Sequence, residues 1–175
     1  RRYFGKNPEE IYDTFELSSH KAATIGQVHK AFLDGKELAV KIQYPGVADS
    51  ISSDLALVKP FAIRMFNLKG KDSDRYFKEV EHKLVEETHY ELEVERSLLI
   101  SDKCKVIPGL SFPEYFKEYS NEKIITMSWL HGVHLSDFSK SNTDQVLANK
   151  IGQTLWDFYM FQMHGIRMVH ADPHP

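Results

Sequence analysis

Two β-rich runs joined by an Asp-Gly turn constrain the fold of this 175-residue chain more than any other feature. Residues 24–32 and 37–43 carry many β-branched and apolar side chains, and the link between them is Leu33-Asp34-Gly35-Lys36. Aspartate followed by glycine accepts the backbone conformations that a tight hairpin turn requires. The sequence therefore predicts an antiparallel hairpin with Lys41 on its second strand.

Helical and strand patterns cover most of the remaining chain. Asn7 is predicted to cap a short helix that has Pro8 at its first position and ends near Phe15. Apolar residues at helical spacing predict further helices at residues 50–66, 74–101, 135–138 and 143–163. β-branched and apolar runs predict strands at residues 110–115 and 123–129. The expected fold class is α+β, an antiparallel sheet covered by helices.

Composition excludes several classes of protein. A formal net charge of −3 gives no basic excess, so we expect no nucleic-acid partner. The only cysteine, Cys104, cannot form an internal disulfide and is better explained as a small buried hydrophobe than as a catalytic group. No apolar run approaches the roughly 18 residues of a membrane-spanning helix. The first residue is not Met, so the chain is expected to be a fragment or an excised domain.

The last residues contain an H-x-D cluster, His170-Ala171-Asp172. In the protein-kinase catalytic loop H-R-D-x-x-x-x-N, the Asp contacts the substrate hydroxyl and the Asn holds magnesium. Counted from Asp172, that Asn would fall at position 177, beyond Pro175. His, Asp and Pro are also ordinary loop residues, so the cluster alone does not separate a catalytic loop from a structural one.

Upstream segments can be compared with the two N-terminal kinase motifs. When the glycine-rich loop pattern is placed on Lys21 to Val28, only its third glycine, Gly26, is kept, and an ordinary strand entry remains an alternative. Lys41 follows Val28 by thirteen residues in Ala39-Val40-Lys41, as the phosphate-pairing lysine would. A solvent-exposed lysine on an amphipathic strand is the competing explanation.

A phosphate-binding lysine needs a carboxylate to orient it, and the predicted helix at residues 74–101 offers several glutamates. Glu86 and Glu93 are seven residues apart, so an ideal helix would place them within about 20° of each other. Periodicity does not decide which of the two faces Lys41. Most of the other charges on this helix are expected to form a solvated face.

Taken together, these segments resemble the UbiB-type (aarF-domain) atypical kinase-like or ATPase family over nearly the whole chain. Residues 22–29 resemble the family's alanine-rich A-A-S-I-G-Q-V-H loop, and residues 39–47 its V-K-[IV]-Q-x-P-G-V strand and turn. Residues 87–93 resemble its E-x-D-Y-x-x-E segment, and residues 170–175 the start of its H-A-D-P-H-P-G-N loop.

The resemblance implies a role for individual residues. Lys41 would contact phosphate, Glu93 would be its ion-pair partner and Asp172 would be the catalytic-loop acid. Glu87 matches the first acid of E-x-D, whereas His89 stands where the family has Asp. The implied nucleotide-binding loop is Ala22, Ala23, Thr24, Ile25, Gly26, Gln27 and Val28. The implied adenine-binding hinge is Met127, Ser128, Trp129 and Leu130, with Ser128 where an acid is usual.

The resemblance also implies a fold, a function and a cellular setting. Residues 1–130 would form a kinase-like N-terminal lobe with inserted helices, and residues 131–175 the start of a helical C-terminal lobe. The parent protein would use ATP and Mg²⁺ in phosphoryl chemistry that supports biosynthesis of ubiquinone or a related isoprenoid quinone. Its partners would be lipid quinone precursors and quinone-biosynthesis proteins. It would be cytoplasmic at the inner face of a membrane, peripherally attached through regions outside this chain, or alternatively mitochondrial.

Two family elements fall outside residues 1–175, namely the upstream K-x-G-Q helix and the downstream Asn with D-F-G. All metal ligands are therefore expected beyond Pro175, and residues 1–175 alone are expected to bind nucleotide weakly and to turn none over. A non-catalytic, pseudokinase-like scaffold that binds nucleotide or a partner is the alternative function. His89 and Ser128 favour that alternative.

Overall fold

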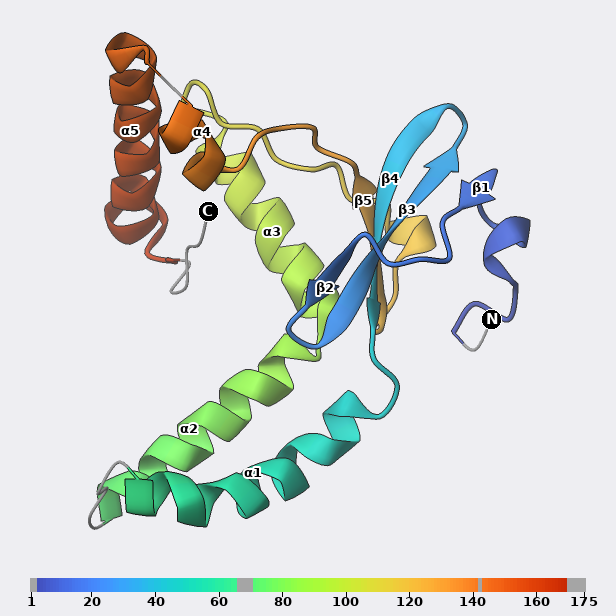
Figure 1. Ribbon diagram of the computed structural model, residues 1–175, viewed down its shortest axis with the longest axis vertical. Coiled ribbons are helices and arrows are strands. Elements are labelled where there is room, and N and C mark those ends of the chain that lie inside the picture. Colours follow the sequence, from blue (N-terminus) through green and yellow to red (C-terminus); the bar gives the residue numbers. More distant parts are fainter. Residues whose placement is uncertain (1–2, 66–70, 142, 170–175) are drawn as a thin grey trace. The chain divides into compact units, whose positions relative to one another are not determined.

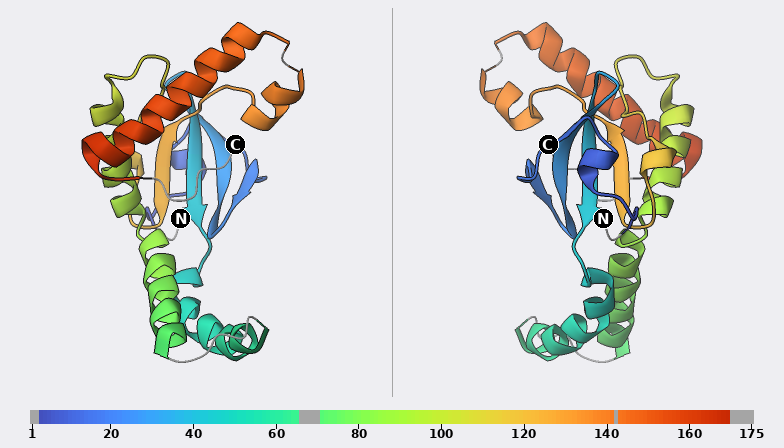
Figure 2. Two further views of the ribbon diagram at one scale, coloured as in Figure 1. Left: turned by 90° about the vertical axis from the view of Figure 1, so that its left-hand side faces the viewer. Right: turned by 90° about the vertical axis from the view of Figure 1, so that its right-hand side faces the viewer.

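Five strands form one antiparallel sheet in the computed structural model, which describes residues 3–65, 71–141 and 143–169. The strands stand side by side in both views of Figure 2. β3 pairs with β4, β4 pairs with β5, and both β1 and β2 pair with β3. The strands are β1 (Thr14–Phe15), β2 (Lys21–Ala23), β3 (Gly26–Leu33), β4 (Lys36–Gln43) and β5 (Ile124–Ser128). β4, which carries Lys41, therefore has a hydrogen-bonded neighbour on each side.

The predicted Asp-Gly hairpin is confirmed as the turn between β3 and β4. Asp34 and Gly35 both have positive φ, 51° and 74°, as a two-residue hairpin turn requires. β3 begins at Gly26 and not at Thr24, because Thr24 and Ile25 form the turn of a second hairpin between β2 and β3. The alanine-rich segment is therefore a short hairpin.

The sheet buries one face in an apolar core, which follows from the alternation of side chains along a strand. On β4, Leu38 and Val40 point into this core, so Ala39 and Lys41 lie on the opposite face. The buried members of the core are Tyr12, Ala31, Leu38, Val40 and Ile124.

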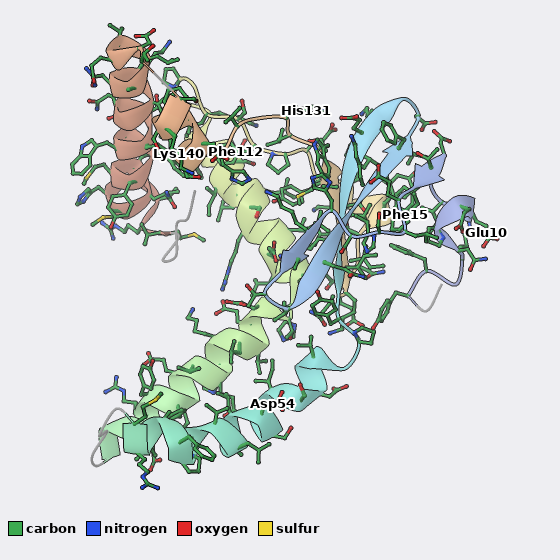
Figure 3. All side chains as sticks on the ribbon, viewed as in Figure 1. Glu10, Phe15, Asp54, Phe112, His131 and Lys140 are labelled. Carbon is green, nitrogen blue, oxygen red and sulfur yellow. The ribbon has the colours of Figure 1, made fainter. Side chains whose placement is uncertain are left out.

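The N-terminal segment packs against the core and differs from the predicted helix. The segment contains a 3-10 turn, η1 (Pro8–Glu10). The backbone amide of Asn7 caps this turn by donating to the Glu10 carboxylate over 2.6 Å. The prediction that this helix reaches Phe15 is wrong, because Phe15 belongs to β1. Its ring, labelled in Figure 3, stacks on the His29 ring with 5.1 Å between centroids. Sheet pairing is the interaction that ends the helix early.

Two helices follow β4 and lie side by side (Figure 1). They are α1 (Val47–Met65) and α2 (Lys71–Glu87), which match the expected helix at residues 50–66 and the first part of the one expected at 74–101. Lys59 of α1 pairs with Asp74 over 2.7 Å, and its ammonium lies 5.6 Å from the Phe77 ring centroid. These contacts join the two helices near their connection.

The prediction of a single long helix at residues 74–101 is wrong. The structure breaks it at Thr88 and His89, after which α3 (Tyr90–Cys104) begins. At the break, the Gln43 side chain donates to the Thr88 carbonyl oxygen over 2.9 Å. A hydrogen bond from β4 thus satisfies a backbone acceptor that the helix leaves open.

The strand predicted at residues 110–115 is also wrong. That segment makes one isolated bridge, Tyr115 with Met127, beside the 3-10 turn η2 (Lys117–Tyr119). Pro113 lacks the amide hydrogen that a paired strand would need. The strand predicted at residues 123–129 is confirmed as β5.

The chain divides into two compact units. The first contains residues 1–94 and 114–129, and the second contains residues 95–113 and 130–175. The second holds α4 (Leu135–Ser141), α5 (Gln145–Met160) and a π-helical turn, η3 (Phe161–Ile166). The helices expected at 135–138 and 143–163 are thus present, and the α+β class is confirmed. The division into two kinase lobes at residue 130 stays a prediction.

Candidate functional site

An ion pair joins the central strand to the helix that follows the break. The Lys41 Nζ atom lies 2.8 Å from both Oε1 and Oε2 of Glu93. The exposed fractions of these side chains are 19% for Lys41 and 40% for Glu93. Glu93 lies in the first turn of α3, where the helix dipole favours a negative charge. The structure therefore places a half-buried ammonium group beside the Glu93 carboxylate.

The other glutamate left open by periodicity, Glu86, lies near the end of α2. It accepts a hydrogen bond from Lys83 over 2.9 Å, one turn earlier on the same helix. Because the helix is interrupted at Thr88 and His89, Glu86 and Glu93 do not share one continuous helical face. The break thus separates two residues that helical periodicity treated as equivalent.

Tyr90 lies between the ion pair and the sheet. Its exposed fraction is 0%, and the Lys41 Nζ atom lies 4.7 Å from the centroid of its ring. Burial raises the pKa of the Tyr90 hydroxyl, and the carboxylates of Glu93 and Glu87 raise it further. The phenol therefore remains protonated at neutral pH.

Gly26 packs against this tyrosine. A Cβ atom on Gly26 would clash with the Ile42 carbonyl oxygen and would lie 2.8 Å from the Tyr90 hydroxyl oxygen. The residue must therefore lack a side chain so that β3 can approach β4 and α3. This requirement is independent of any ligand.

Gln43 attaches β4 to the break between the helices. It lies two residues beyond Lys41 on the same face of the strand, and its exposed fraction is 2%. The side-chain amide of Gln43 donates to the Thr88 carbonyl oxygen, and its backbone amide donates to the Lys123 carbonyl oxygen. Lys41 and Gln43 thus make parallel attachments to Glu93 and Thr88, on either side of the start of α3.

The alanine-rich segment forms the rim beside this site. Ala22 and Thr24 are exposed, Ala23 is half-buried, and Ile25 is buried. The Ile25 carbonyl accepts a hydrogen bond from the Tyr44 amide over 3.0 Å, which ties the turn to the end of β4. Gln27 and Val28 follow on β3, where Val28 lies directly opposite Lys41. The segment and Lys41 therefore occupy neighbouring strands.

The expected hinge lies at the end of β5 and beyond it. The Ser128 amide donates to the Glu114 carbonyl over 2.8 Å, and the Trp129 amide donates to the Glu37 carbonyl over 2.9 Å. Met127 pairs with Ala39 of β4. Leu130 follows directly and is exposed. The Ser128 amide thus has an acceptor outside the sheet, and the Trp129 amide has one on β4.

Three further residues were predicted for the site, namely Glu87, His89 and Asp172. Glu87 and His89 are exposed and flank the buried Thr88 at the helix break. Asp172 lies outside the described residues, so its relation to Lys41 stays a prediction.

Residues 3–65, 71–141 and 143–169 contain no group of three or more His, Cys, Asp or Glu side chains placed to hold a metal ion. Within those same ranges, every helix is too short or too polar to cross a membrane.

Sequence reasoning missed Tyr90, Gln43 and Thr88 as parts of this site. Tyr90 matches the Tyr of the family segment E-x-D-Y-x-x-E, but neither that resemblance nor its sequence neighbours mark it as an aromatic platform for Lys41. Gln43 offered a weak signal, because a glutamine two residues after Lys41 lies on the same strand face as the lysine.

The fold and the ion pair together define a kinase-like N-terminal lobe, and comparisons with known proteins give its family. The model of the ABC1 atypical kinase-like domain matches residues 1–175. The chain therefore belongs to the ABC1 atypical kinase-like family, and the resemblance to aarF-domain proteins is confirmed.

Curated relatives carry names consistent with this family. AarF domain-containing kinase 1 of Drosophila melanogaster is 31% identical over 97% of this chain, and the match covers 33% of that protein. The mitochondrial atypical kinase COQ8B of Danio rerio is 32% identical over 97% of this chain and 27% of its own length. A chloroplastic relative of Arabidopsis thaliana, ACTIVITY OF BC1 COMPLEX KINASE 8, is 28% identical over 98% of this chain and 23% of its own. The chain thus spans a third or less of each of these relatives.

A solved structure shares the fold. Rv3197 of Mycobacterium tuberculosis, determined in complex with erythromycin, superposes with a TM-score of 0.74 and is 26% identical. The match covers 94% of this chain and 42% of that one. An antiparallel sheet with attached helices, arranged as in this relative, supports the kinase-like fold class.

Proposed function

We propose that the protein containing this chain is an ATP-binding atypical kinase or ATPase that performs phosphoryl chemistry with magnesium. The observation that carries the proposal is the pair of 2.8 Å contacts between Lys41 and both carboxylate oxygens of Glu93. In kinases, the strand lysine and a helix glutamate form this pair, and the lysine binds nucleotide phosphates. Membership of the ABC1 family supports the same reading.

The proposal gives Lys41 the role of holding phosphate oxygens. An ammonium group that is already oriented by Glu93 and partly shielded from water stabilises phosphate charge without a large reorganisation. The alanine-rich segment beside it, from Ala22 to Val28, would cover the phosphates in place of a glycine-rich loop. Alanine side chains would limit how closely that backbone approaches an anion.

The segment Met127, Ser128, Trp129 and Leu130 would bind adenine through backbone groups. Because the amides of Ser128 and Trp129 already donate to the Glu114 and Glu37 carbonyls, adenine would have to use other groups of the segment, such as the Leu130 amide. Asp172 would orient the attacking oxygen. Magnesium, when bound with ATP, would neutralise phosphate charge. Its expected ligands lie beyond Pro175, so we assign it no step.

The family resemblance links the protein to ubiquinone or related isoprenoid quinone biosynthesis, with lipid quinone precursors and quinone-biosynthesis proteins as partners. A cytoplasmic position at the inner face of a membrane, or a mitochondrial one, would suit such substrates. The names of relatives place one in mitochondria and another in chloroplasts.

A non-catalytic nucleotide-binding scaffold is the second candidate. Two departures from the family pattern favour it, His89 in place of an acid and Ser128 in the expected hinge. Such a protein would keep the Lys41–Glu93 pair for binding and would lack turnover.

Turnover of ATP by the full-length protein separates the two candidates. The wild type, Lys41→Ala and Asp172→Asn would be compared at saturating magnesium, with Lys59→Ala as a control. Lys59 is also partly buried and forms its own 2.7 Å ion pair with Asp74, between α1 and α2. Loss of turnover in Lys41→Ala and Asp172→Asn, but not in Lys59→Ala, is expected. Equal turnover in all four proteins would refute the enzymatic proposal, and ATP binding without wild-type turnover would favour the scaffold.

A further inference from the structure

Tyr90 is a buried residue to which neither the sequence nor the proposed function assigns a role. It is the first residue of α3, three positions before Glu93, and its exposed fraction is 0%. Its hydroxyl oxygen is buried, and among the residues that the structure describes it has no hydrogen-bond partner. Phenylalanine would fill most of the same space without an unpaired polar atom, whose burial costs about 1–3 kcal/mol.

The two ends of the side chain make different contacts. The Lys41 ammonium lies 4.7 Å from the ring centroid, within the range of a cation–π interaction. The hydroxyl oxygen lies 2.8 Å from the place where a Cβ atom on Gly26 would be. The hydroxyl therefore fills the space that a missing side chain leaves on β3, and the backbone there limits movement of the ring.

A lysine side chain has many rotamers, and an ion pair to one partly exposed carboxylate does not fix it strongly. A ring face 4.7 Å from the ammonium excludes lysine conformations that would overlap the ring. Together with the Glu93 carboxylate, whose oxygens lie 2.8 Å from Nζ, it restricts the position of Nζ. The Glu93 carboxylate attracts the Lys41 ammonium by its charge, and the Tyr90 ring limits the position of the ammonium by contact.

We propose that Tyr90 is the positioning residue for Lys41: its ring face holds the ammonium where Glu93 reaches it. The significance of this role rests on the proposed function, because a positioned Lys41 matters for chemistry only if it binds phosphate. The ring face, and not the hydroxyl, contacts the ammonium, so a phenylalanine should largely replace the tyrosine.

Chemical labelling of lysines in the full-length protein, without nucleotide, tests this role directly. A short pulse of acetic anhydride followed by peptide mass spectrometry gives a labelling rate for each lysine. Tyr90→Phe keeps the ring, and Tyr90→Met removes it while filling similar space with a flexible chain. Tyr90→Leu serves as a second non-aromatic variant should the methionine variant fail to fold. Lys30, of similar exposure and also ion-paired, is the internal control.

We expect Lys41 to label several-fold faster in the non-aromatic variants than in the wild type. Tyr90→Phe should keep a rate close to that of the wild type, and the Lys30 rate should not change in any protein. Equal Lys41 rates throughout, or an equal rise at Lys30, would overturn the proposal. A Phe variant as fast as the Met variant would overturn it as well, because the ring would then not be the holding group.

A second arm repeats the wild-type measurement with ATP and magnesium. Protection of Lys41 by ATP is expected from the proposed function. An aromatic-dependent rate without protection by ATP would contradict the proposed function and support the role of Tyr90, so the two failures are distinguishable.

Discussion

The hydroxyl oxygen of Tyr90 lies 2.8 Å from the point that a Cβ atom on Gly26 would occupy. The Ile42 carbonyl oxygen crowds the same point from the neighbouring strand. A glycine that the sequence assigns to a phosphate-binding loop is thus required by packing between β3, β4 and α3. Its neighbours on β4 and α3 are sufficient to account for its lack of a side chain.

Gly26→Ala should therefore destabilise the protein by about 1–3 kcal/mol, the usual effect of forcing a methyl group into a packed site. Thermal unfolding monitored by circular dichroism checks the change. Adding Tyr90→Phe should restore only part of the loss, because the Ile42 carbonyl belongs to the backbone and cannot move as a side chain can.

Gly152→Ala is the matched control for this experiment. Gly152 lies inside α5, and a Cβ atom there would have no atom within 4 Å. Alanine in a helix interior should raise stability by about 0.5–1 kcal/mol. A Gly26→Ala protein as stable as the wild type would contradict the packing account.

Gln43→Leu should destabilise the protein by about 1–3 kcal/mol, because it leaves the Thr88 carbonyl oxygen without its buried donor. Gln153→Leu is a control with the same substitution. Gln153 donates to Asp157 over 2.7 Å on the exposed face of α5, and such a pair contributes only about 0.2–0.5 kcal/mol. Chemical unfolding of both variants gives the comparison, and equal losses would show that the attachment at Thr88 is unimportant.

The outcome at Thr88 also shows where sequence reasoning succeeded and where it failed. The hairpin at Asp34 and Gly35 was predictable because its turn depends on the backbone preferences of those two residues alone. The break between α2 and α3 has no Gly or Pro to mark it. It is accompanied by a hydrogen bond from Gln43, 45 residues away, which no local pattern contains.

Local sequence patterns were also insufficient to predict the candidate site. Lys41 could be placed on a strand from local alternation, but the choice between Glu86 and Glu93 assumed one uninterrupted helix. Residues near position 112 have the apolar character of a strand, yet Pro113 cannot donate to a neighbour, and they form no strand. A long-range contact with Lys41 decided the choice of glutamate, whereas the missing amide hydrogen of Pro113 is a local cause.

Alkaline pH should destabilise the protein from about pH 10 upward. Burial raises the pKa values of Tyr12 and Tyr90 above the usual 10.0, with a smaller contribution from Tyr119 for Tyr12 and from Glu93 for Tyr90. Above pH 10 the unfolded chain loses these protons first, so the stability present below pH 10 decreases as the pH rises. The loss per tyrosine is at most about 1.4 kcal/mol per pH unit.

Thermal unfolding midpoints between pH 8 and pH 11 measure this decrease. Tyr90→Phe should make it shallower, whereas Tyr76→Phe, at an exposed position of α2, should not. An equally steep decrease in the wild type and in a Tyr12→Phe/Tyr90→Phe double variant would show that other groups cause the alkaline loss.

The most direct test of the central claim is a double-mutant cycle on Lys41 and Glu93, read as equilibrium binding of ATP with magnesium to the full-length protein. If the pair forms a phosphate-binding unit, Lys41→Met and Glu93→Gln should each weaken ATP binding by roughly 10- to 100-fold, the effect of one lost charge-assisted contact. The double variant should bind about as weakly as the weaker single variant. Lys59→Met and Asp74→Asn, which break another ion pair between α1 and α2, should leave ATP binding unchanged. Unchanged ATP binding in Lys41→Met, or the same loss in the Lys59 control, would contradict the account.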